Sequence, residues 1–356
     1  MSGARPSVSC VNRSPSSPVT KRASLVAVGV SLALCAAIYA GSRGLATFDS
    51  ALIPYTVATI FLAFGVTYRY VVWISAPASR RLFKRGWGSF FSVANFRKAP
   101  TALPRMILTY LGMQKFLGAR SHARWAAHQL MFWGCLLAVA ITFPLVWGWF
   151  TFTSSTGAGP GYEMRVFGLK VLGYDSSSII GWLMFHGLDI AAVLVIPGAG
   201  YFLWRRMRDR RAMTGQRFAY DFVPLISLLV IAVTGLLLTF SSIMLHGGGY
   251  EFLALLHMVS VVFTLIYIPF GKFFHIVQRP AAVGMQLFKY TARKDEEILV
   301  CRRCEEPIDT TPFVENLRGT MRDLRLDFDE WAEYCPRCKR VLRGGAYLDH
   351  VKRGFK

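Results

Sequence analysis

The sequence predicts an all-α membrane protein: a bundle of six transmembrane helices with a small cytoplasmic C-terminal metal-binding domain. The chain has 356 residues, of which 53% are hydrophobic. Its apolar runs are about 20 residues long, the length that a helix needs to cross the hydrocarbon layer of a bilayer. The connections between these runs alternate between strongly basic and nearly charge-balanced, and four cysteines form two close pairs near the end. The six apolar runs lie near residues 24–42, 51–75, 127–152, 178–203, 219–245 and 252–276.

The first segment, residues 1–23, is rich in Ser, Pro and Arg and is expected to be a disordered cytoplasmic tail. The first apolar run could instead be a cleaved signal sequence. Cys35 and Ile38 occupy positions where such a cleavage site has small residues, so we expect an uncleaved first span.

The placement of charge predicts the topology. The formal net charge is +21, which taken alone is compatible with nucleic-acid binding. The segment from Ser79 to Arg124, however, holds ten Lys or Arg and no acidic residue, and six arginines follow the fourth run between Arg205 and Arg217. The other connections, around 43–50, 153–177 and 246–251, are short or nearly balanced. This alternation is the positive-inside pattern, so we expect a multi-pass protein of the cytoplasmic (inner) membrane with both termini in the cytoplasm and no nucleic-acid partner.

Four histidines fall inside the predicted spans, where an ionisable side chain is costly and indicates function. His128 lies in the third span, His186 in the fourth, and His257 and His275 in the sixth. The last two are eighteen residues apart, which is five helical turns and about 27 Å along one helix face. One face would then carry an imidazole near each membrane surface, as electron transfer through two stacked bis-His haems requires. Two interfacial histidines that happen to align are the alternative.

The topology pairs these histidines by depth. The third span begins at the cytoplasmic side with His128, and the sixth ends there with His275. His186 and His257 lie near the starts of two spans that run inward, so they share the outer level. We therefore predict two haem b groups, and at least the inner one.

The final hairpin contains a distinctive set of residues, Leu256-His257, Phe270 to Ile276, Pro280 and Gln286 to Tyr290, and the second run contains Tyr55 with Tyr68 to Tyr70. In these residues the chain resembles a known family, the gamma (cytochrome b) subunit of respiratory nitrate reductase, over about residues 51–290 and most specifically in the final hairpin. In this resemblance His128 matches the cytoplasmic-side ligand. It implies a di-haem membrane anchor in which quinol is oxidised near the outer haem and electrons pass inward to an iron–sulfur partner.

The sequence departs from the family at one ligand. The family has a second histidine about ten residues after the first on the same helix, where Ala138 stands here. We expect His186 to replace it. Asp189, one turn further, could orient the ring of His186 or relay a proton, or could be a polar residue facing the bundle interior. His246, beside three glycines, could contact quinone or be solvated, and His122 is expected to be solvated.

The C-terminal domain, residues 281–356, contains the pairs Cys301/Cys304 and Cys335/Cys338. Two Cys-x-x-Cys pairs separated by about 30 residues supply a tetrahedral set of thiolates for zinc or a single iron. Rubredoxin-like iron sites usually have a small residue after each second cysteine, whereas Glu305 and Lys339 follow here, so zinc is preferred and mononuclear iron is the alternative. A short amphipathic helix is expected between Phe313 and Trp331, packed on the cysteine pairs. The isolated Cys10, Cys35 and Cys135 are expected to be packing or tail residues.

These observations favour a quinone-reactive cytochrome b subunit of an oxidoreductase complex, with either direction of electron flow open. No nucleotide-binding motif or ferredoxin-type cysteine run occurs in the chain, so the substrate chemistry belongs to a cytoplasmic iron–sulfur or flavin subunit, and no catalytic residue is assigned here. A proton-coupled secondary transporter and a zinc-ribbon scaffold without redox chemistry are the alternatives.

Overall fold

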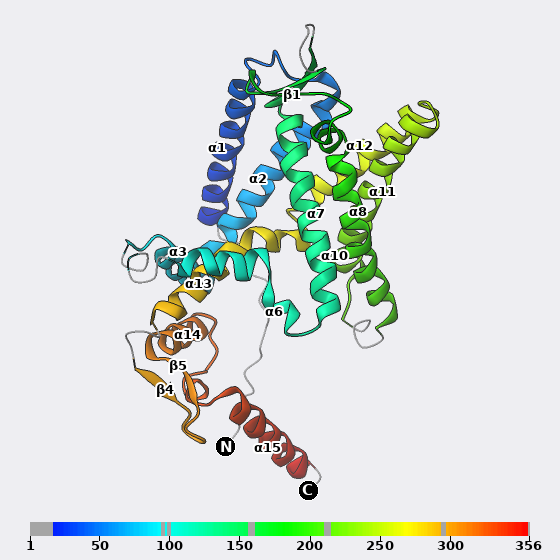
Figure 1. Ribbon diagram of the computed structural model, residues 1–356. Coiled ribbons are helices and arrows are strands. Elements are labelled where there is room, and N and C mark those ends of the chain that lie inside the picture. The colour runs from blue at the N-terminus through cyan, green and yellow to red at the C-terminus, as the bar shows by residue number, and fades with distance from the viewer. Residues whose placement is uncertain are drawn as a thin grey trace.

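The computed structural model describes residues 17–93, 97, 101–155, 161–209, 215–292 and 297–354 (Figure 1). Within these residues it is mostly helical and confirms the predicted fold class, with six helices long and apolar enough to cross a membrane. They are α1 (Ser17–Gly41), α2 (Ile53–Ser75, preceded by the 3-10 turn η1, Ser50–Leu52), α7 (His122–Val146), α8 (Ile179–Arg208), α11 (Val223–Met244) and α12 (Tyr250–Tyr267).

The six helices pack in a fixed order. α1 lies on α2, α2 on α12, α12 on α11, α11 on α8, and α8 on α7. The α7–α8 contact is made close by small residues: a Cβ on Gly198 would lie 2.6 Å from the carbonyl oxygen of Ala127, and one on Gly134 would lie 2.8 Å from that of Ala191. Small residues allow this approach between helices in a membrane, where packing rather than the hydrophobic effect drives association.

A small sheet covers one end of the bundle, opposite the basic loops (Figure 1). β1 (Phe150–Ser154), β2 (Tyr162–Val166) and β3 (Leu169–Tyr174) form an antiparallel sheet in the order β1-β2-β3. The turn between β2 and β3 is Phe167-Gly168, with φ of 51° and 79°, the left-handed backbone that a two-residue hairpin turn requires. From the sequence, this segment was expected only to connect two spans.

The basic end is built from short helices that were not predicted. α3 (Pro77–Phe90), α5 (Ala102–Met106), the π-helical turn η2 (Ile107–Gly112) and α6 (Lys115–Gly118) follow the second span, and α10 (Phe218–Asp221) precedes the fifth. α13 (His275–Ala292) packs against α3 across the end of the bundle (Figure 1). The two helices cross at Gly86 and Gly284, where a Cβ on Gly284 would lie 2.2 Å from the carbonyl oxygen of Gly86.

The predicted sixth span is wrong at its C-terminal end. α12 stops at Tyr267, and a turn and the 3-10 segment η3 (Lys272–Phe274) separate it from α13, which begins at His275. Pro269 has no backbone N–H and so interrupts the helical hydrogen bonds, and Arg69 of α2 donates to the carbonyl oxygens of Pro269 and Gly271. His257 and His275 therefore do not share one helix face.

Two predicted boundaries also need correction. Ser17 to Ala23 are the first residues of α1, so the prediction of a disordered tail over residues 1–23 is wrong for this part, and its first 16 residues lie outside the described residues. The predicted boundary between residues 280 and 281 falls inside α13, a single helix that packs against α3.

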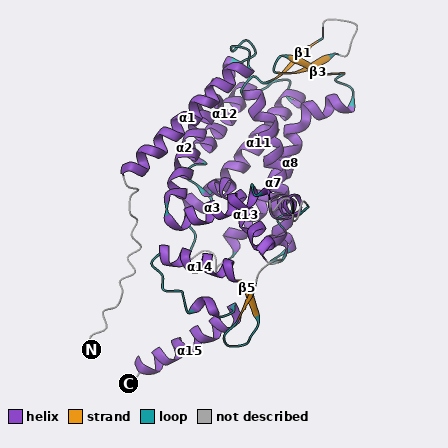
Figure 2. Cartoon of the chain, turned by 90° about the vertical axis from the view of Figure 1, so that its left-hand side faces the viewer, coloured by secondary structure: helices purple, strands orange, loops and turns teal. Residues whose placement is uncertain are grey.

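The C-terminal region lies below the bundle on the side of α3 and α13 (Figure 2). It consists of the antiparallel strands β4 (Ile298–Val300) and β5 (Pro307–Thr310), then α14 (Thr311–Asp323), the turn η4 (Trp331–Glu333) and α15 (Pro336–Gly354). α14 confirms the amphipathic helix expected between residues 313 and 331. Leu324 and Leu326, which were included in it, lie beyond its end and are about half exposed.

Candidate functional site

The four singled-out histidines lie at two depths. His186 and His257 each lie seven residues after the first residue of their helices, α8 and α12, which both start at the end that carries the sheet (Figure 1). At 1.5 Å per residue each is about 10 Å along its helix. His128 lies six residues after the start of α7 at the basic end, and His275 is the first residue of α13 at that same end.

His128 and His275 lie near each other although the helix predicted to carry His275 is not continuous. Both rings and the guanidinium of Arg279 are close enough to interact electrostatically. The Nδ1 atom of His128 is buried and has no hydrogen-bond partner among the described residues, and its ring meets the edge of Phe202 at 6.3 Å between centroids. His275 is exposed, and its Nδ1 lies 2.6 Å from the carbonyl oxygen of Lys272. That carbonyl can only accept, so Nδ1 carries the proton and Nε2 is the free nitrogen.

His257 is held by the neighbouring span. Its Nδ1 lies 2.9 Å from the hydroxyl oxygen of Thr234 in α11, and that hydroxyl lies 2.7 Å from the carbonyl oxygen of Val230. Since a hydroxyl has one proton and the carbonyl takes it, Thr234 accepts from His257 Nδ1–H. Nε2 of His257 is left as the nitrogen available to a ligand. Gly235 leaves room for the ring, because a Cβ there would lie 3.5 Å from Cε1 of His257.

His186 is held through a carboxylate. Its Nδ1 lies 2.8 Å from Oδ2 of Asp189, and Oδ1 of Asp189 accepts a hydrogen bond of 2.8 Å from the hydroxyl of Thr239 in α11. The ring of Trp182 lies 5.1 Å from that of His186, centroid to centroid. This contact favours the first of the three interpretations of Asp189, that it orients the ring of His186.

The two histidines nearer the sheet, His186 and His257, are linked through α11. α8 and α12 both pack on α11, and each histidine is bonded to it or through it, His257 by Thr234 and His186 by way of Asp189 and Thr239. No hydrogen bond joins the two rings among the described residues. Their sharing of one haem therefore stays a prediction.

Thr234, Thr239 and the carbonyl of Lys272 were missed from the sequence. The signal for the threonines was present: they are polar residues inside α11, the most apolar of the six spans. A backbone carbonyl leaves no signal in a sequence. His122 and His246 are exposed, as the solvated interpretation of each predicts, and His246 has a φ of 47° in the turn before α12.

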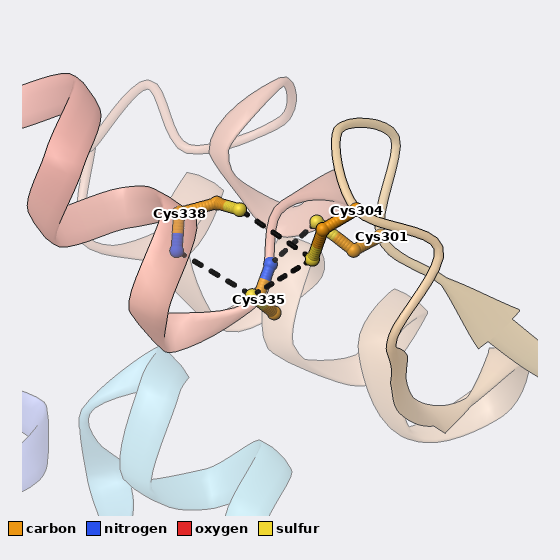
Figure 3. Close-up of side chains that lie close together, drawn as sticks. All are labelled: Cys301, Cys304, Cys335 and Cys338. Atoms are coloured by element: carbon orange, nitrogen blue, oxygen red, sulfur yellow. Dashed lines mark hydrogen bonds between the residues drawn. The ribbon is translucent and has the colours of Figure 1, made fainter.

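The four cysteines of the C-terminal domain converge (Figure 3). Cys301 and Cys304 follow β4, and Cys335 and Cys338 lie at the start of α15. Their Sγ atoms all lie within 4.8 Å of one another, with 3.5 Å between Cys304 and Cys338 and 3.6 Å between Cys304 and Cys335. Metal–sulfur bonds of about 2.3 Å in a tetrahedron give sulfur–sulfur distances of about 3.8 Å, so the cluster has the dimensions of a four-thiolate metal site.

Backbone groups stabilise negative charge on this cluster. The N–H of Cys335 donates to Sγ of Cys301 at 3.2 Å, and the N–H of Cys338 donates to Sγ of Cys335 at 3.4 Å. Burial raises the pKa of Cys301, but N–H groups of Cys335, Arg303 and Cys304 oppose it and lower that pKa to about 6. Burial and the neighbouring sulfurs raise the pKa of Cys338 to about 12. Four thiolates together therefore require a cation.

The cysteine domain is attached to the basic end of the bundle. Arg81 of α3 pairs with Asp323 of α14 at 3.0 Å, and Lys289 of α13 pairs with the buried Asp309 of β5. The ammonium of Lys289 also lies 4.9 Å from the ring centre of Phe313. The metal-binding unit thus contacts both α3 and α13.

No family model, no curated protein and no solved structure matches this chain. Its function is therefore inferred from its own residues and their contacts.

Proposed function

We propose that this chain is a di-haem cytochrome b subunit that exchanges electrons between membrane quinol or quinone and a cytoplasmic oxidoreductase partner. The observation that carries the proposal is the state of the ring nitrogens. His186, His257 and His275 each have Nδ1 bonded to a different acceptor, namely a carboxylate, a hydroxyl and a backbone carbonyl. Metal-ligating histidines are held in this way, because the bond at one nitrogen fixes the ring and leaves the other for the metal.

Two further observations support it. His128 keeps a buried ring nitrogen without a partner, which is unfavourable unless a ligand or ion uses the ring. It also lies near His275, whose ring is held with Nε2 free, so two imidazoles of separate elements meet at the basic end. A secondary transporter with a proton relay would not require bound Nδ1 atoms at both depths.

When bound, haem b supplies one-electron redox chemistry at potentials set by its axial ligands and their hydrogen bonds. His128 and His275 would hold the inner group, and His186 and His257 the outer one. Thr234 and Asp189 keep two of the imidazoles oriented and basic. At the outer level, the proposal also assigns the Asp189 carboxylate as an acceptor for a proton released on quinol oxidation.

For the C-terminal domain, the same proposal assigns a structural zinc ion to Cys301, Cys304, Cys335 and Cys338. All four positions of the tetrahedron are protein thiolates, which is typical of a structural rather than a catalytic zinc site. Its contacts with α3 and α13 suit a module that docks the cytoplasmic partner beside the inner haem.

A dithionite-reduced visible spectrum of the purified full-length protein tests the function. We expect a b-type α-band and about two haems per chain. His275→Ala should remove the inner haem and retain the outer one, and His257→Ala should do the reverse. His122→Ala, a change at an exposed histidine at the start of α7, is the matched control and should leave both. A purified protein without b-type haem would contradict the proposal and favour the zinc-ribbon scaffold.

A further inference from the structure

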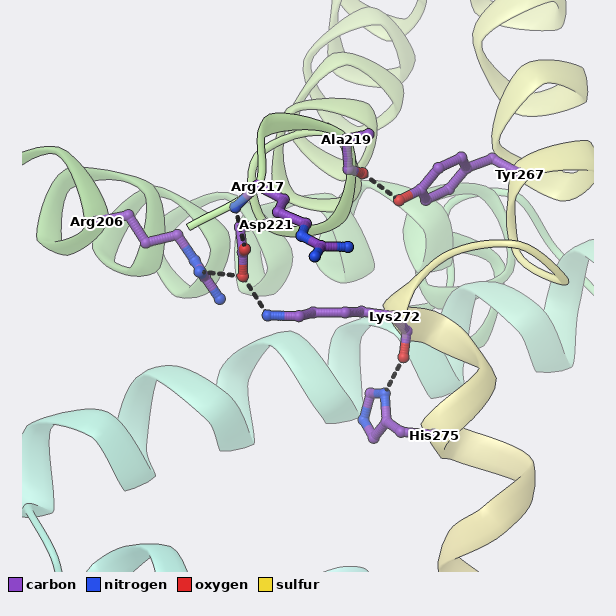
Figure 4. A network of polar contacts seen from close by, with 7 residues as sticks. All are labelled: Arg206, Arg217, Ala219, Asp221, Tyr267, Lys272 and His275. Atoms are coloured by element: carbon purple, nitrogen blue, oxygen red, sulfur yellow. Dashed lines mark hydrogen bonds and ion pairs between the residues drawn. The ribbon is translucent and has the colours of Figure 1, made fainter. Parts of the chain in front are cut away.

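A buried carboxylate lies at the basic end, outside the six spans. Asp221 is the last residue of α10 and only 7% exposed. Its Oδ1 accepts from Arg206 at 2.7 Å and from the ammonium of Lys272, and its Oδ2 accepts from the backbone N–H of Arg217 at 2.9 Å (Figure 4). Breaking a buried pair by removing one partner leaves the other charge without compensation, which is strongly unfavourable.

These bonds join three parts of the chain. Arg206 is in the last turn of α8, Asp221 closes α10, and Lys272 begins η3. A parallel contact, from the hydroxyl of Tyr267 to the carbonyl oxygen of Ala219, ties the end of α12 to α10 as well. The turn between α12 and α13 is therefore held to α10 at both of its ends, by Tyr267 and by Lys272.

Lys272 has two roles in this arrangement. Its side chain is bound by Asp221, and its backbone carbonyl accepts from His275 Nδ1 at 2.6 Å (Figure 4). His275 is exposed, so packing alone does not fix the rotation of its ring. The hydrogen bond to Lys272 is the contact that sets both the tautomer and the direction of Nε2.

We propose that Asp221 is a positioning residue for His275: by holding Lys272 in place it fixes the carbonyl that orients the imidazole toward the site shared with His128. This inference rests on the proposed function. Asp221 is not expected to touch the haem itself.

Two cations surround Asp221, so neutralising its carboxylate should have a specific structural effect. Arg206 and Lys272 both point at its Oδ1. With a neutral amide at position 221 these two cations repel each other. Lys272 is the one that moves more easily, because it lies in the short segment η3, whereas Arg206 is part of the long helix α8. We expect η3 to shift and the Lys272 carbonyl to lose its alignment with His275.

The test is a redox and EPR comparison of full-length wild type, Asp221→Asn and Lys272→Met in detergent. We expect both variants to change the low-spin ferric signal of the inner haem. We also expect at least a tenfold change in its reduction equilibrium, which is about 59 mV for a one-electron couple. The outer haem should be unchanged. Because the two changes break one contact, the double variant should add little to either single one.

Asp209→Asn is the matched control. It removes the same charge at the same end, but among the described residues Asp209 forms its ion pair with Arg205 in the last turn of α8, at 3.4 Å. It should leave the inner signal and potential at the wild-type values. If Asp221→Asn does not accumulate, Lys272→Met carries the test.

The possible results separate this inference from the function on which it rests. Wild type with two haems and an inner haem unchanged in Asp221→Asn and Lys272→Met would overturn the positioning role alone. An equal shift in Asp209→Asn would also overturn it, because the effect would then be one of net charge. Wild type without haem would overturn both proposals.

Discussion

The ring nitrogens of the histidines show how neighbouring polar residues define a site. In α11, Thr234 has its hydroxyl proton committed to Val230 and can therefore only accept from His257. In α8, Asp189 is bonded on both oxygens, to His186 and to Thr239. A side-chain partner of this kind typically changes metal affinity or activity by 10- to 100-fold when it is removed.

Thr234→Val should weaken the outer haem without changing the fold. Valine has the same shape but leaves Nδ1 of His257 without an acceptor, a loss of about 1–3 kcal/mol for a buried group. We expect a shifted outer-haem potential or substoichiometric outer haem in a redox titration. Thr264→Val is the control, because in the described part of the chain the Thr264 hydroxyl donates to the carbonyl of Ser260 in its own helix. Identical titrations for Thr234→Val and wild type would show that this hydroxyl does not support a ligand.

The pH dependence of the Asp221 contact follows from its pKa. Burial raises that pKa, but Lys272, the N–H of Arg217 and Arg206 together lower it below the ordinary value of 3.8. Because the folded state lowers this pKa, the carboxylate stabilises the fold fully at any pH above the ordinary value of 3.8. The stabilisation is lost as the pH falls through the lowered pKa. The stability difference between wild type and Asp221→Asn should therefore be constant from about pH 5 to 8 and shrink only below about pH 4. Thermal unfolding at several pH values measures it, and a difference that varies near pH 7 would contradict the assignment.

Among the helices, the crossing of α3 and α13 forms the platform for the metal-binding domain. Gly86 is buried in this crossing and Gly88, on the same helix, faces open space. A Cβ on Gly86 would lie 2.8 Å from the carbonyl oxygen of Ala281, a backbone atom that cannot move without moving α13. One added methyl group at Gly86 would therefore push α13 away from α3, whereas the same methyl group at Gly88 would fit without moving either helix.

Gly86→Ala should destabilise the platform and Gly88→Ala should not. Overpacking of this kind costs about 1–3 kcal/mol, whereas alanine at an exposed helical glycine gains up to about 1 kcal/mol. Limited proteolysis of the C-terminal domain in the membrane-embedded protein measures the effect, with faster release expected only for Gly86→Ala. Equal release from both variants would show that the crossing is looser than the structure indicates.

At the scale of elements, the spans were predictable because hydrophobic length is a direct signal. Five of them are found close to the expected limits, but the sixth ends at Tyr267. Pro269 and Gly271 were visible in the sequence, yet spans in membranes tolerate such residues, so the interruption depends on the contacts made by Arg69. The sheet β1-β2-β3 and the helices α3 and α13 were not predicted. Both helices are amphipathic, so their sequences did carry a helical signal, which the strong charge pattern of the same segments overshadowed.

For the whole molecule, the candidate sites were predicted unequally. The cysteine spacing alone specified the cluster, since four thiols in two pairs have few other arrangements. The depths of the histidines were predicted from the topology. His128 and His275 lie near each other although the predicted sixth helix is too long, because their proximity depends on depth and not on helix phase. The pairing of His186 with His257 needs the lateral arrangement around α11, which sequence order does not contain.

Removing the metal should release the C-terminal domain from the bundle. Metal binding and folding are coupled in small four-cysteine domains, and the contacts of Arg81 and Lys289 require β5 and α14 to be folded. We expect one zinc per chain by elemental analysis, and chelation or Cys335→Ser to expose the domain to protease while the six spans remain protected. Arg81→Ala, which retains the metal but loses the ion pair with Asp323, is the comparison. Iron in place of zinc would correct the metal assignment, and unchanged protease resistance after metal loss would contradict the coupling.

Single-cysteine labelling tests the predicted orientation. In a background with the native cysteines blocked, His246→Cys at the sheet end should react with an impermeant maleimide added outside intact cells. Lys352→Cys in α15 should react only after lysis. The reverse pattern would invert the topology that the positive-inside rule predicts.

The interruption at Pro269 has a consequence for assembly. Because His275 follows the last span, the ribosome must finish all six membrane helices before the inner imidazole pair can exist, whereas His186 and His257 are already present by Tyr267. On the proposed function, cofactor loading would then be ordered, with the outer group first and the inner one last. A chain terminated after Tyr267 should accumulate with one haem, and a haem-free product would exclude this sequence of maturation.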